Sequence, residues 1–187
     1  MKHTLVALVE DKPGVLNRVA SLFRRRAFNI ESLTVGHTDQ PNVSRMTIVL
    51  DSDTTSAHLV EANLAKLVNV IDVQDVTGKD TISRDLALVK VRADAGGRAE
   101  IAQLVEIFRA KIVDVATDSV VVEITGDEEK IDGLVELLRP KGILEMVRTG
   151  RVSMVRGNQA SDRKNGKSNG NGNGNGQHFD VSSAGSV

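Results

Sequence analysis

The stretch LVALVEDKPGVLNRVASLF, residues 5–23, decides the fold of the first part of the chain. It opens with an apolar run of strand length, residues 5–9, and then passes through the charged and turn-forming residues 10–14. After this turn, apolar residues recur at the three- and four-residue spacing of a helix that buries one face. The residues predicted on that face are Val15, Leu16, Val19, Ala20, Leu22 and Phe23. The stretch therefore predicts a strand, a tight turn and a helix.

The elements that follow extend this pattern to residue 76. Two strands are predicted at residues 28–35 and 43–50, because the turn-forming residues 39–42 separate two β-rich runs. A second helix follows a cap near Thr54, and a fourth strand covers residues 68–76. The apolar face of that helix comprises Ala57, Val60, Leu64 and Leu67. The predicted order of elements is β-α-β-β-α-β.

The same order returns about 80 residues later. Strands are predicted at residues 86–91, 112–115, 120–124 and 143–147, the last with an extension toward residue 155. The two helices between them carry apolar faces made of Ile101, Leu104, Val105 and Phe108, and of Ile131, Leu134, Val135 and Leu138. Asp127 to Glu129 favour the start of the second of these helices, and Pro140 with Gly142 its end.

The predicted fold class is α/β, with two ferredoxin-like βαββαβ sandwiches in tandem. They cover residues 1–78 and 84–157 and join near residues 78–84. From residue 158 onward Asn, Gly, Ser and Lys dominate, and residues 169–176 alternate strictly between Asn and Gly. Such a composition cannot bury enough apolar surface to offset the entropy of ordering, so residues 158–187 are predicted to be a disordered tail.

Three of the predicted strands are apolar on both faces, which a half-solvated sheet would not be. They are residues 5–9, 86–89 and 120–122. A ferredoxin-like sandwich covers only one sheet face with its helices, so we expect a further cover on the other face. Self-association, the neighbouring domain and another protein remain open as its source.

Composition excludes several classes of function. The chain has 24 basic and 25 acidic residues, and four Phe with no Tyr or Trp, which argues against nucleic-acid binding. It has no cysteine, and its four histidines lack metal-ligand spacing, so neither a metal site nor a catalytic residue is predicted. No apolar run approaches the roughly 20 residues of a membrane span. The expectation is a cytoplasmic protein that binds no membrane.

One segment, residues 10–16, has the character of a binding site. A strand ends there, the chain turns through Pro13 and Gly14, and the free amides of a helix start suit a small carboxylate. Asp11 could accept a hydrogen bond from an ammonium group, and Asn29 could serve either end of an amino acid. The structural alternative is that Asp11 caps the helix, Pro13 and Gly14 form a turn, and Asn29 adopts a left-handed conformation.

The same segment resembles the ACT domain, an amino-acid-binding regulatory module, through VEDKPGVLNRVASLF (9–23) and NIESLTV (29–35). Together with SRMTI (44–48), the second of these is similar to the small, regulatory subunit of acetolactate synthase. Further stretches of the second unit agree with this family: IFRAKIVDV (107–115), EITG (123–126) and EMVRTGRVSMVRG (145–157). The resemblance covers residues 1–157 and excludes the tail.

The resemblance implies a subunit with no active site and no cofactor of its own. It implies that the chain activates a catalytic subunit carrying thiamine diphosphate, Mg and FAD, and confers feedback inhibition by valine or another branched-chain amino acid. Effector sites of the family lie between paired ACT domains, so a homodimer is expected. The predicted effector-binding residues are Asp11, Pro13, Gly14, Val15, Leu16, Asn29 and Ile30.

Within this set, Gly14 and Asn29 match effector positions of the family, and Leu16 and Ile30 are placed to form its apolar wall. Asp11 departs from the family pattern, because many relatives carry Asn there. Two other functions remain as alternatives. One is a free-standing amino-acid sensor that regulates another enzyme. The other is an enzyme in its own right, for which the sequence offers no catalytic group.

Overall fold

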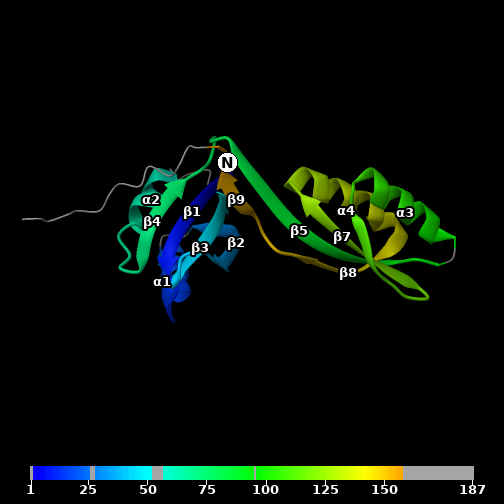
Figure 1. Cartoon of the computed structure of the whole chain (residues 1–187), viewed down its shortest axis with the longest axis horizontal. Coiled ribbons are helices and arrows are strands. Elements are labelled where there is room, and N and C mark those ends of the chain that lie inside the picture. Colours follow the sequence, from blue (N-terminus) through cyan, green and yellow to red (C-terminus); the bar gives the residue numbers. More distant parts are fainter. Residues whose placement is uncertain (1, 26–27, 52–56, 95, 158–187) are drawn as a thin grey trace, which may run out of the picture.

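The computed structural model describes residues 2–25, 28–51, 57–94 and 96–157, which form two α/β lobes (Figure 1). Each lobe consists of an antiparallel sheet, of four strands in the first lobe and five in the second, with two helices on one face. The tandem α/β architecture predicted from the sequence is therefore confirmed. The predicted tail, residues 158–187, and the predicted cap at Thr54 lie outside the described residues.

The first lobe has the predicted β-α-β-β-α-β order. Its elements are β1 (Lys2–Glu10), α1 (Val15–Arg25), β2 (Asn29–His37), β3 (Val43–Asp51), α2 (Ala57–Leu64) and β4 (Val70–Asp75). The strand order in the sheet is β2-β3-β1-β4, so β2 and β4 are the edge strands.

The core of this lobe lies between the sheet and its helices. Alternate residues of β1, Leu5, Ala7 and Val9, pack against the buried face of α1, as the period of two requires. The helix buries Val15, Val19, Leu22 and Phe23. The prediction for Leu16 and Ala20 is wrong, because both are exposed. A helix on a sheet buries a narrow stripe, and these two residues lie on its flank.

The second lobe repeats this architecture with one additional strand. Its elements are β5 (Thr81–Arg92), α3 (Gly97–Ile107), β6 (Lys111–Val115), β7 (Ser119–Gly126), α4 (Glu128–Gly142), β8 (Ile143–Arg148) and β9 (Val152–Val155). Asp127 caps α4 by accepting a hydrogen bond from the Lys130 amide at 2.9 Å. The predicted apolar stripe of α4 is confirmed, and the helix ends at Gly142, whose φ is +95°.

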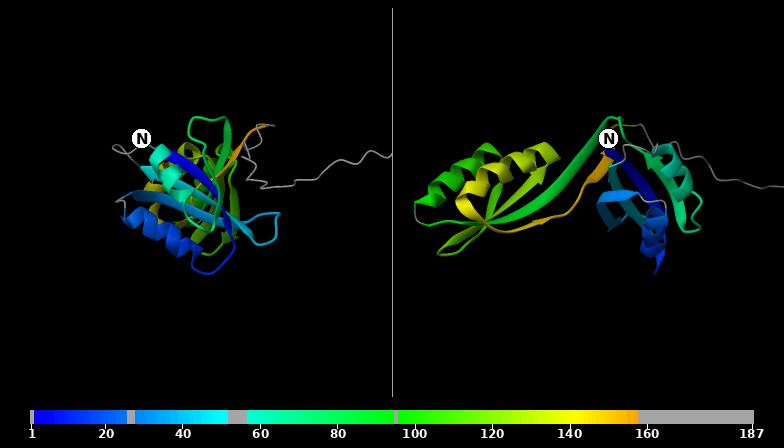
Figure 2. Two further views of the ribbon diagram at one scale, coloured as in Figure 1. Left: turned by 90° about the vertical axis from the view of Figure 1, so that its left-hand side faces the viewer. Right: turned by 180° about the vertical axis from the view of Figure 1, so that it is seen from behind.

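The junction between the lobes differs from the predicted linker. Thr81–Arg84 are already part of β5, where they pair with β9, while the rest of β5 joins the sheet of the second lobe. The predicted extension of the last strand toward Val155 is interrupted after Arg148 and resumes as β9. Figures 1 and 2 show β5 running from the junction into the second lobe as one long strand.

The outer face of the first sheet is covered by this junction. Thr4, Val6, Thr47 and Val49 point away from the helices, yet each is at most 8% exposed. Arg45 donates from Nη2 to the Ser153 carbonyl at 2.7 Å, which holds β9 against this face. Of the three covers left open by the sequence, the neighbouring domain supplies this one. The second sheet has no equivalent cover among the described residues, and Leu88 and Val147 are 36% and 56% exposed.

Candidate functional site

The loop between β1 and α1 is anchored by its backbone. The Asp11 amide donates to the Asn42 carbonyl at 2.8 Å, and the Lys12 amide donates to the Glu10 carbonyl at 3.0 Å. Gly14 then turns the chain into the helix with a φ of +85°, a conformation that side chains with a Cβ rarely adopt. The loop is therefore anchored by its backbone, and its last position favours glycine.

The start of α1 is open and suits an anion. The first intrahelical bond runs from the Arg18 amide to the Gly14 carbonyl at 3.0 Å, so the amides of Leu16 and Asn17 precede it. The first turn of α1 contains no acidic residue. A Cβ added at Gly14 would meet no heavy atom within 4 Å. Free amides, the positive end of the helix dipole and open space are thus combined at one point.

Asp11 lies beside this helix start with a largely available carboxylate. Gly14, and not Asp11, directly precedes the helix, so the interpretation of Asp11 as its cap is wrong. The Asp11 Oδ2 atom lies 3.3 Å from His37 Nδ1, and the two side chains are 48% and 85% exposed. Asp11 is therefore placed to attract a cationic group at the mouth of the loop.

The carboxylate of Glu10, in contrast, is already bound by neighbouring side chains of the same lobe. Its Oε2 accepts from Asn69 Nδ2 at 2.6 Å and lies 3.1 Å from Lys12 Nζ, and Arg18 binds the same Asn69 side chain. The hydrogen bond from Asn69, assisted by Lys12, holds the pKa of Glu10 below its ordinary value. Its charge is thus neutralised locally, which leaves Asp11 as the available carboxylate of the loop.

One chain does not bring all the predicted residues together. Asn29 pairs with Asp51 at one end of β3, whereas His37, beside Asp11, pairs with Ser44 at the other end. Eight strand residues at about 3.3 Å each separate Asn29 from His37 by about 26 Å. Asn29 is not among the described residues with positive φ, so the left-handed interpretation is wrong.

The apolar members of the predicted site differ in exposure. Val15 is 4% exposed and serves the core, whereas Leu16 is 46% exposed and can contact a ligand. Ile30 is half-buried and packs against the core of the first lobe from the start of β2. Leu16 is therefore the apolar residue that the structure leaves free at the helix start.

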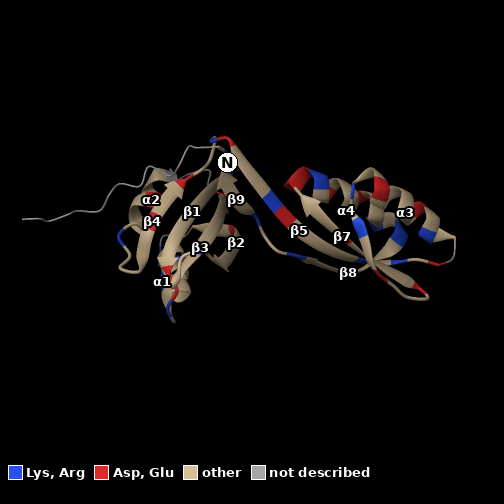
Figure 3. Ribbon diagram, in the orientation of Figure 1, with Lys and Arg blue, Asp and Glu red and all other residues tan. Residues whose placement is uncertain are grey.

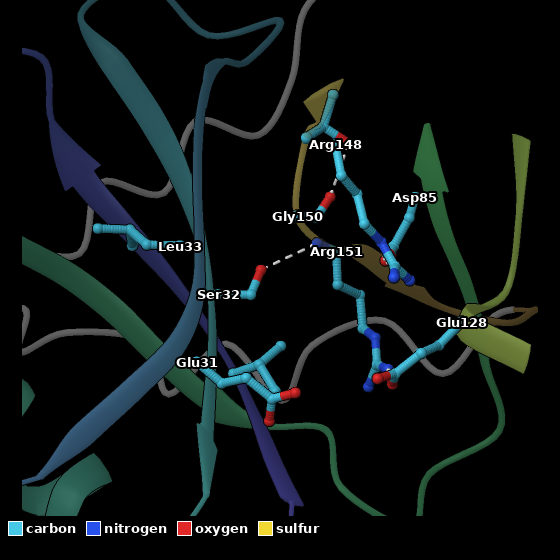
Figure 4. A pocket seen from close by; sticks show the side chains of 10 residues that line it. Glu31, Ser32, Leu33, Asp85, Glu128, Arg148, Gly150 and Arg151 are labelled. Carbon is cyan, nitrogen blue, oxygen red and sulfur yellow. Dashed lines mark hydrogen bonds and ion pairs between the residues drawn. The ribbon is translucent and has the colours of Figure 1, made fainter. Parts of the chain in front are cut away.

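A second concave region, which the sequence did not predict, lies between the lobes. It is a cavity of about 390 Å³, lined on one side by β2 and on the other by the segment after β8 (Figure 4). Its lining residues are Glu31, Ser32, Leu33, Val49, Asp85, Glu128, Arg148, Thr149, Gly150 and Arg151. The only sequence signal was the EMVRTGRVSMVRG stretch, which the resemblance singled out without giving it a role.

The charges at this cavity are arranged in pairs. Lys2 Nζ lies 2.6 Å from both Glu31 and Glu128, and Arg151 Nη2 lies 2.7 Å from Glu128. The hydrogen bond to Lys2 holds the pKa of Glu128 below its ordinary value, and the same contact raises the pKa of Lys2. The two lobes are thus joined by a network of opposite charges.

A second charge cluster fixes the end of β8. Arg148 donates to Asp85 Oδ2 from Nη2 at 2.8 Å and from Nε at 3.1 Å, and Nη1 donates to Asp132 at 2.7 Å. Asp85 is only 7% exposed, and a carboxylate buried to this extent needs a paired cation. This cluster is therefore structural, and it orients the chain as it leaves β8.

The described residues contain no group of three or more His, Cys, Asp or Glu that could hold a metal ion. Basic and acidic residues are intermixed along the ribbons of both lobes (Figure 3). Among the helices that the structure describes, none is both long and apolar enough to cross a bilayer.

The fold of the first lobe and its loop define an ACT domain. A family model described as the AHAS small subunit-like ACT domain matches residues 5–72, and one described as the small subunit of acetolactate synthase matches residues 84–157. Together the two matches span both lobes. The chain belongs to the acetolactate synthase small-subunit family.

Relatives and a solved structure agree with this assignment. The chain is 52% identical over 159 residues to a probable acetolactate synthase small subunit of Archaeoglobus fulgidus, covering 85% of this chain and 99% of the relative. It is 51% identical over 155 residues to the acetolactate synthase small subunit of Mycolicibacterium smegmatis, covering 83% of this chain and 91% of the relative. The crystal structure of the Thermotoga maritima small subunit matches with a TM-score of 0.79 and 42% identity, covering 84% of this chain and 99% of that one.

Proposed function

We propose that this chain is the regulatory subunit of an acetolactate synthase: it binds and activates the catalytic subunit and makes it sensitive to a branched-chain amino acid. Family membership supports the catalytic partner. The observation that carries the effector site is the open start of α1 beside Asp11, with an unpaired strand edge nearby.

The edge position of β2 would allow Asn29 of one copy to reach the β1–α1 loop of a second copy. β2 spans Asn29–His37 at the edge of its sheet, and most of its residues are half-buried or exposed. A two-fold axis at Leu33, the middle residue of β2, would pair the strand antiparallel with its copy. Asn29 would then lie opposite the partner subunit's His37, which is next to Asp11 of that same subunit. Dimerisation through this edge completes a site that one chain leaves in two halves.

Each group of the completed site then has a defined role. The amides at the start of α1, left open by Gly14, receive the carboxylate of the effector, and Asp11 receives its ammonium. Asn29 of the second copy donates or accepts a further hydrogen bond. Leu16 and Ile30 provide apolar surface for a branched side chain. A free α-amino acid with an aliphatic side chain satisfies all of these groups at once.

Catalysis belongs to the partner in this proposal. The condensation of two pyruvates needs thiamine diphosphate with its Mg, and the partner subunit is expected to carry both, together with FAD. The cytoplasm is the proposed location, as for other amino-acid biosynthesis. The alternative, a free-standing amino-acid sensor, shares the effector site but needs no acetolactate synthase.

The test measures pyruvate consumption by a cognate catalytic subunit with and without this chain, across valine, leucine and isoleucine. We expect stimulation by the chain alone and inhibition by at least one of the three amino acids. Asn29→Ala should weaken inhibition, while Gln103→Ala, which removes an exposed amide in the second lobe, should not. Binding of valine without any stimulation would favour the free-standing sensor.

A further inference from the structure

The segment Arg148–Ser153, which we call the strap, connects β8 to β9 and crosses the outer face of the first sheet. Its two ends are fixed differently. Arg148 is tied to the second lobe through Asp85 and Asp132, whereas Ser153 accepts a hydrogen bond from Arg45 of the first lobe. The strap is therefore anchored to both lobes.

The middle of the strap lies directly on β2. The Arg151 amide donates to Ser32 Oγ at 3.1 Å (Figure 4). A Cβ at Gly150 would come within 2.4 Å of Ser32 Oγ and 3.0 Å of Thr34 Oγ1, and the φ of Gly150 is +93°. A side chain at position 150 would have to displace the Ser32 and Thr34 hydroxyls and adopt a backbone conformation that favours glycine. The strap and β2 are thus in close contact at Gly150.

The Arg151 side chain extends the contact to the start of α4. Its Nη2 donates to Glu128 at 2.7 Å and its Nη1 to Thr4 Oγ1 at 3.4 Å. Lys2 of β1 pairs with both Glu31 of β2 and Glu128 of α4. These ion pairs therefore connect β2, through β1, to the second lobe. The Arg151 and Glu128 side chains are 20% and 31% exposed, which makes their pairing stronger than that of a surface pair.

The first residues of β2 carry both the proposed effector residues and the contact with the strap. The register of β2 and β3 shifts between Ile30 and Ser32, so Glu31 is the extra residue of a β-bulge. Asn29 and Ile30, on one side of the bulge, belong to the effector site, and Ser32, on the other side, contacts the strap. Only Ile30 and Glu31 thus separate Asn29 from Ser32 along the strand.

We infer that the strap is the relay of effector occupancy, with Ser32, Gly150 and Arg151 as positioning residues that couple β2 to the second lobe. This inference rests on the proposed function, because it assumes that the effector binds at Asn29 and Ile30. A ligand that repositions the start of β2 shifts Ser32 and Glu31, and the strap carries that shift to the second lobe and β9.

The experiment compares Arg151→Gln with wild type in the holoenzyme. Valine affinity of the isolated chain, measured by calorimetry, should stay within about threefold, since Arg151 does not touch the effector. The valine concentration for half-inhibition of the holoenzyme should rise at least about tenfold, within the range of typical coupling between sites. Stimulation in the absence of valine should be retained. The matched control is Arg156→Gln, which loses the same charge from an exposed pair with Asp80.

Amide hydrogen exchange distinguishes a relay from a merely structural contact. In wild type, valine should slow exchange at residues 11–16 and also at the ribbon formed by 81–84 and 152–155. In Arg151→Gln the first effect should remain and the second should disappear. In Arg151→Gln, Lys2 alone faces the two carboxylates of Glu31 and Glu128, so the cluster carries one excess negative charge. Glu128→Gln combined with Arg151→Gln removes this excess charge, so it should recover the melting temperature without recovering the coupling.

Two results would overturn the relay. One is wild-type inhibition and wild-type exchange in Arg151→Gln. The other is inhibition that returns in the double variant together with the melting temperature, because the contact would then be only structural. Failure of the wild-type chain to bind valine, leucine or isoleucine in calorimetry is a separate readout, which would overturn the proposed effector site and the relay with it.

Discussion

Gly14→Asp, compared with Gly14→Asn, isolates the electrostatic part of effector binding. Gly14 has a φ of +85°, so either side chain strains the backbone, and the cost is about 1–2 kcal/mol. Asp and Asn tolerate this conformation better than other residues, and no heavy atom lies within 4 Å of the new Cβ. Both variants should nevertheless fold, with similarly lowered melting temperatures.

The difference between the two variants is one negative charge. Placed about 4 Å from the effector carboxylate in a partly screened site, it costs about 4 kcal/mol. Since about 1.4 kcal/mol is a factor of ten, Gly14→Asp should bind valine about a thousandfold more weakly than Gly14→Asn. The new Asp would also favour the helix dipole by about 0.3–1 kcal/mol, which partly offsets its backbone strain.

Titration calorimetry of valine into each folded variant, with inhibition assays of the holoenzyme, measures this difference directly. Thermal melts establish first that both proteins are folded at the assay temperature. Stimulation of the catalytic subunit should be similar for the two variants, because they share the same backbone change. If the two variants bind valine with equal affinity, the effector carboxylate does not lie at the start of α1 and the site assignment must be withdrawn.

Light scattering should give a mass at least twice the 20.1 kDa of one chain, and a monomer at micromolar concentration would contradict pairing through β2. Removal of residues 158–187 should leave melting and activation unchanged, because the segment has no periodic apolar residues; weaker activation would show that it docks on the partner. Phe23→Ala should destabilise the first lobe by about 3–5 kcal/mol, seen in calorimetry as an earlier transition of that lobe alone. Glu128, whose pKa lies below the ordinary 4.5, stabilises the fold above that pH and loses this contribution as the pH falls through its folded-state pKa. Glu128→Gln should therefore flatten the acid side of a plot of melting temperature against pH; an unchanged slope would contradict the role of the pair with Lys2.

Periodicity predicted most of the fold because the helices bury one face each. The spacing of Ile131, Leu134, Val135 and Leu138 indicated the buried stripe of α4, and all four residues are buried. Such patterns are local, so they are readable without knowledge of the partners of a helix. Leu16 shows the limit, because its spacing fits a wider apolar face than the sheet covers.

The junction could not be predicted, because it depends on contacts between distant residues. Thr81–Arg84 form a strand by pairing with residues about 70 positions later. Four residues, one of them charged, are too few to show the alternation of apolar and polar residues that predicts a strand. Gly150 is similar: its role comes from the approach of Ser32, more than 100 positions earlier. The site was predictable in part, since the loop at residues 11–14 is local. The separation of Asn29 from Asp11 follows only from strand register.

The register of β2 links these features into one mechanism. An edge strand has one paired side and one free side, so β2 can join β3 on one and a second copy on the other. Its outer face is occupied by the strap, and Ile30 packs into the core on the inner face. The first four residues of β2 therefore have four different neighbours: β3, the proposed second copy, the strap and the core of the first lobe. The bulge at Glu31 separates Asn29 from the long paired run that follows. If the effector binds at Asn29 as proposed, we therefore expect its contact to shift Ser32 and the strap before it shifts the rest of the sheet.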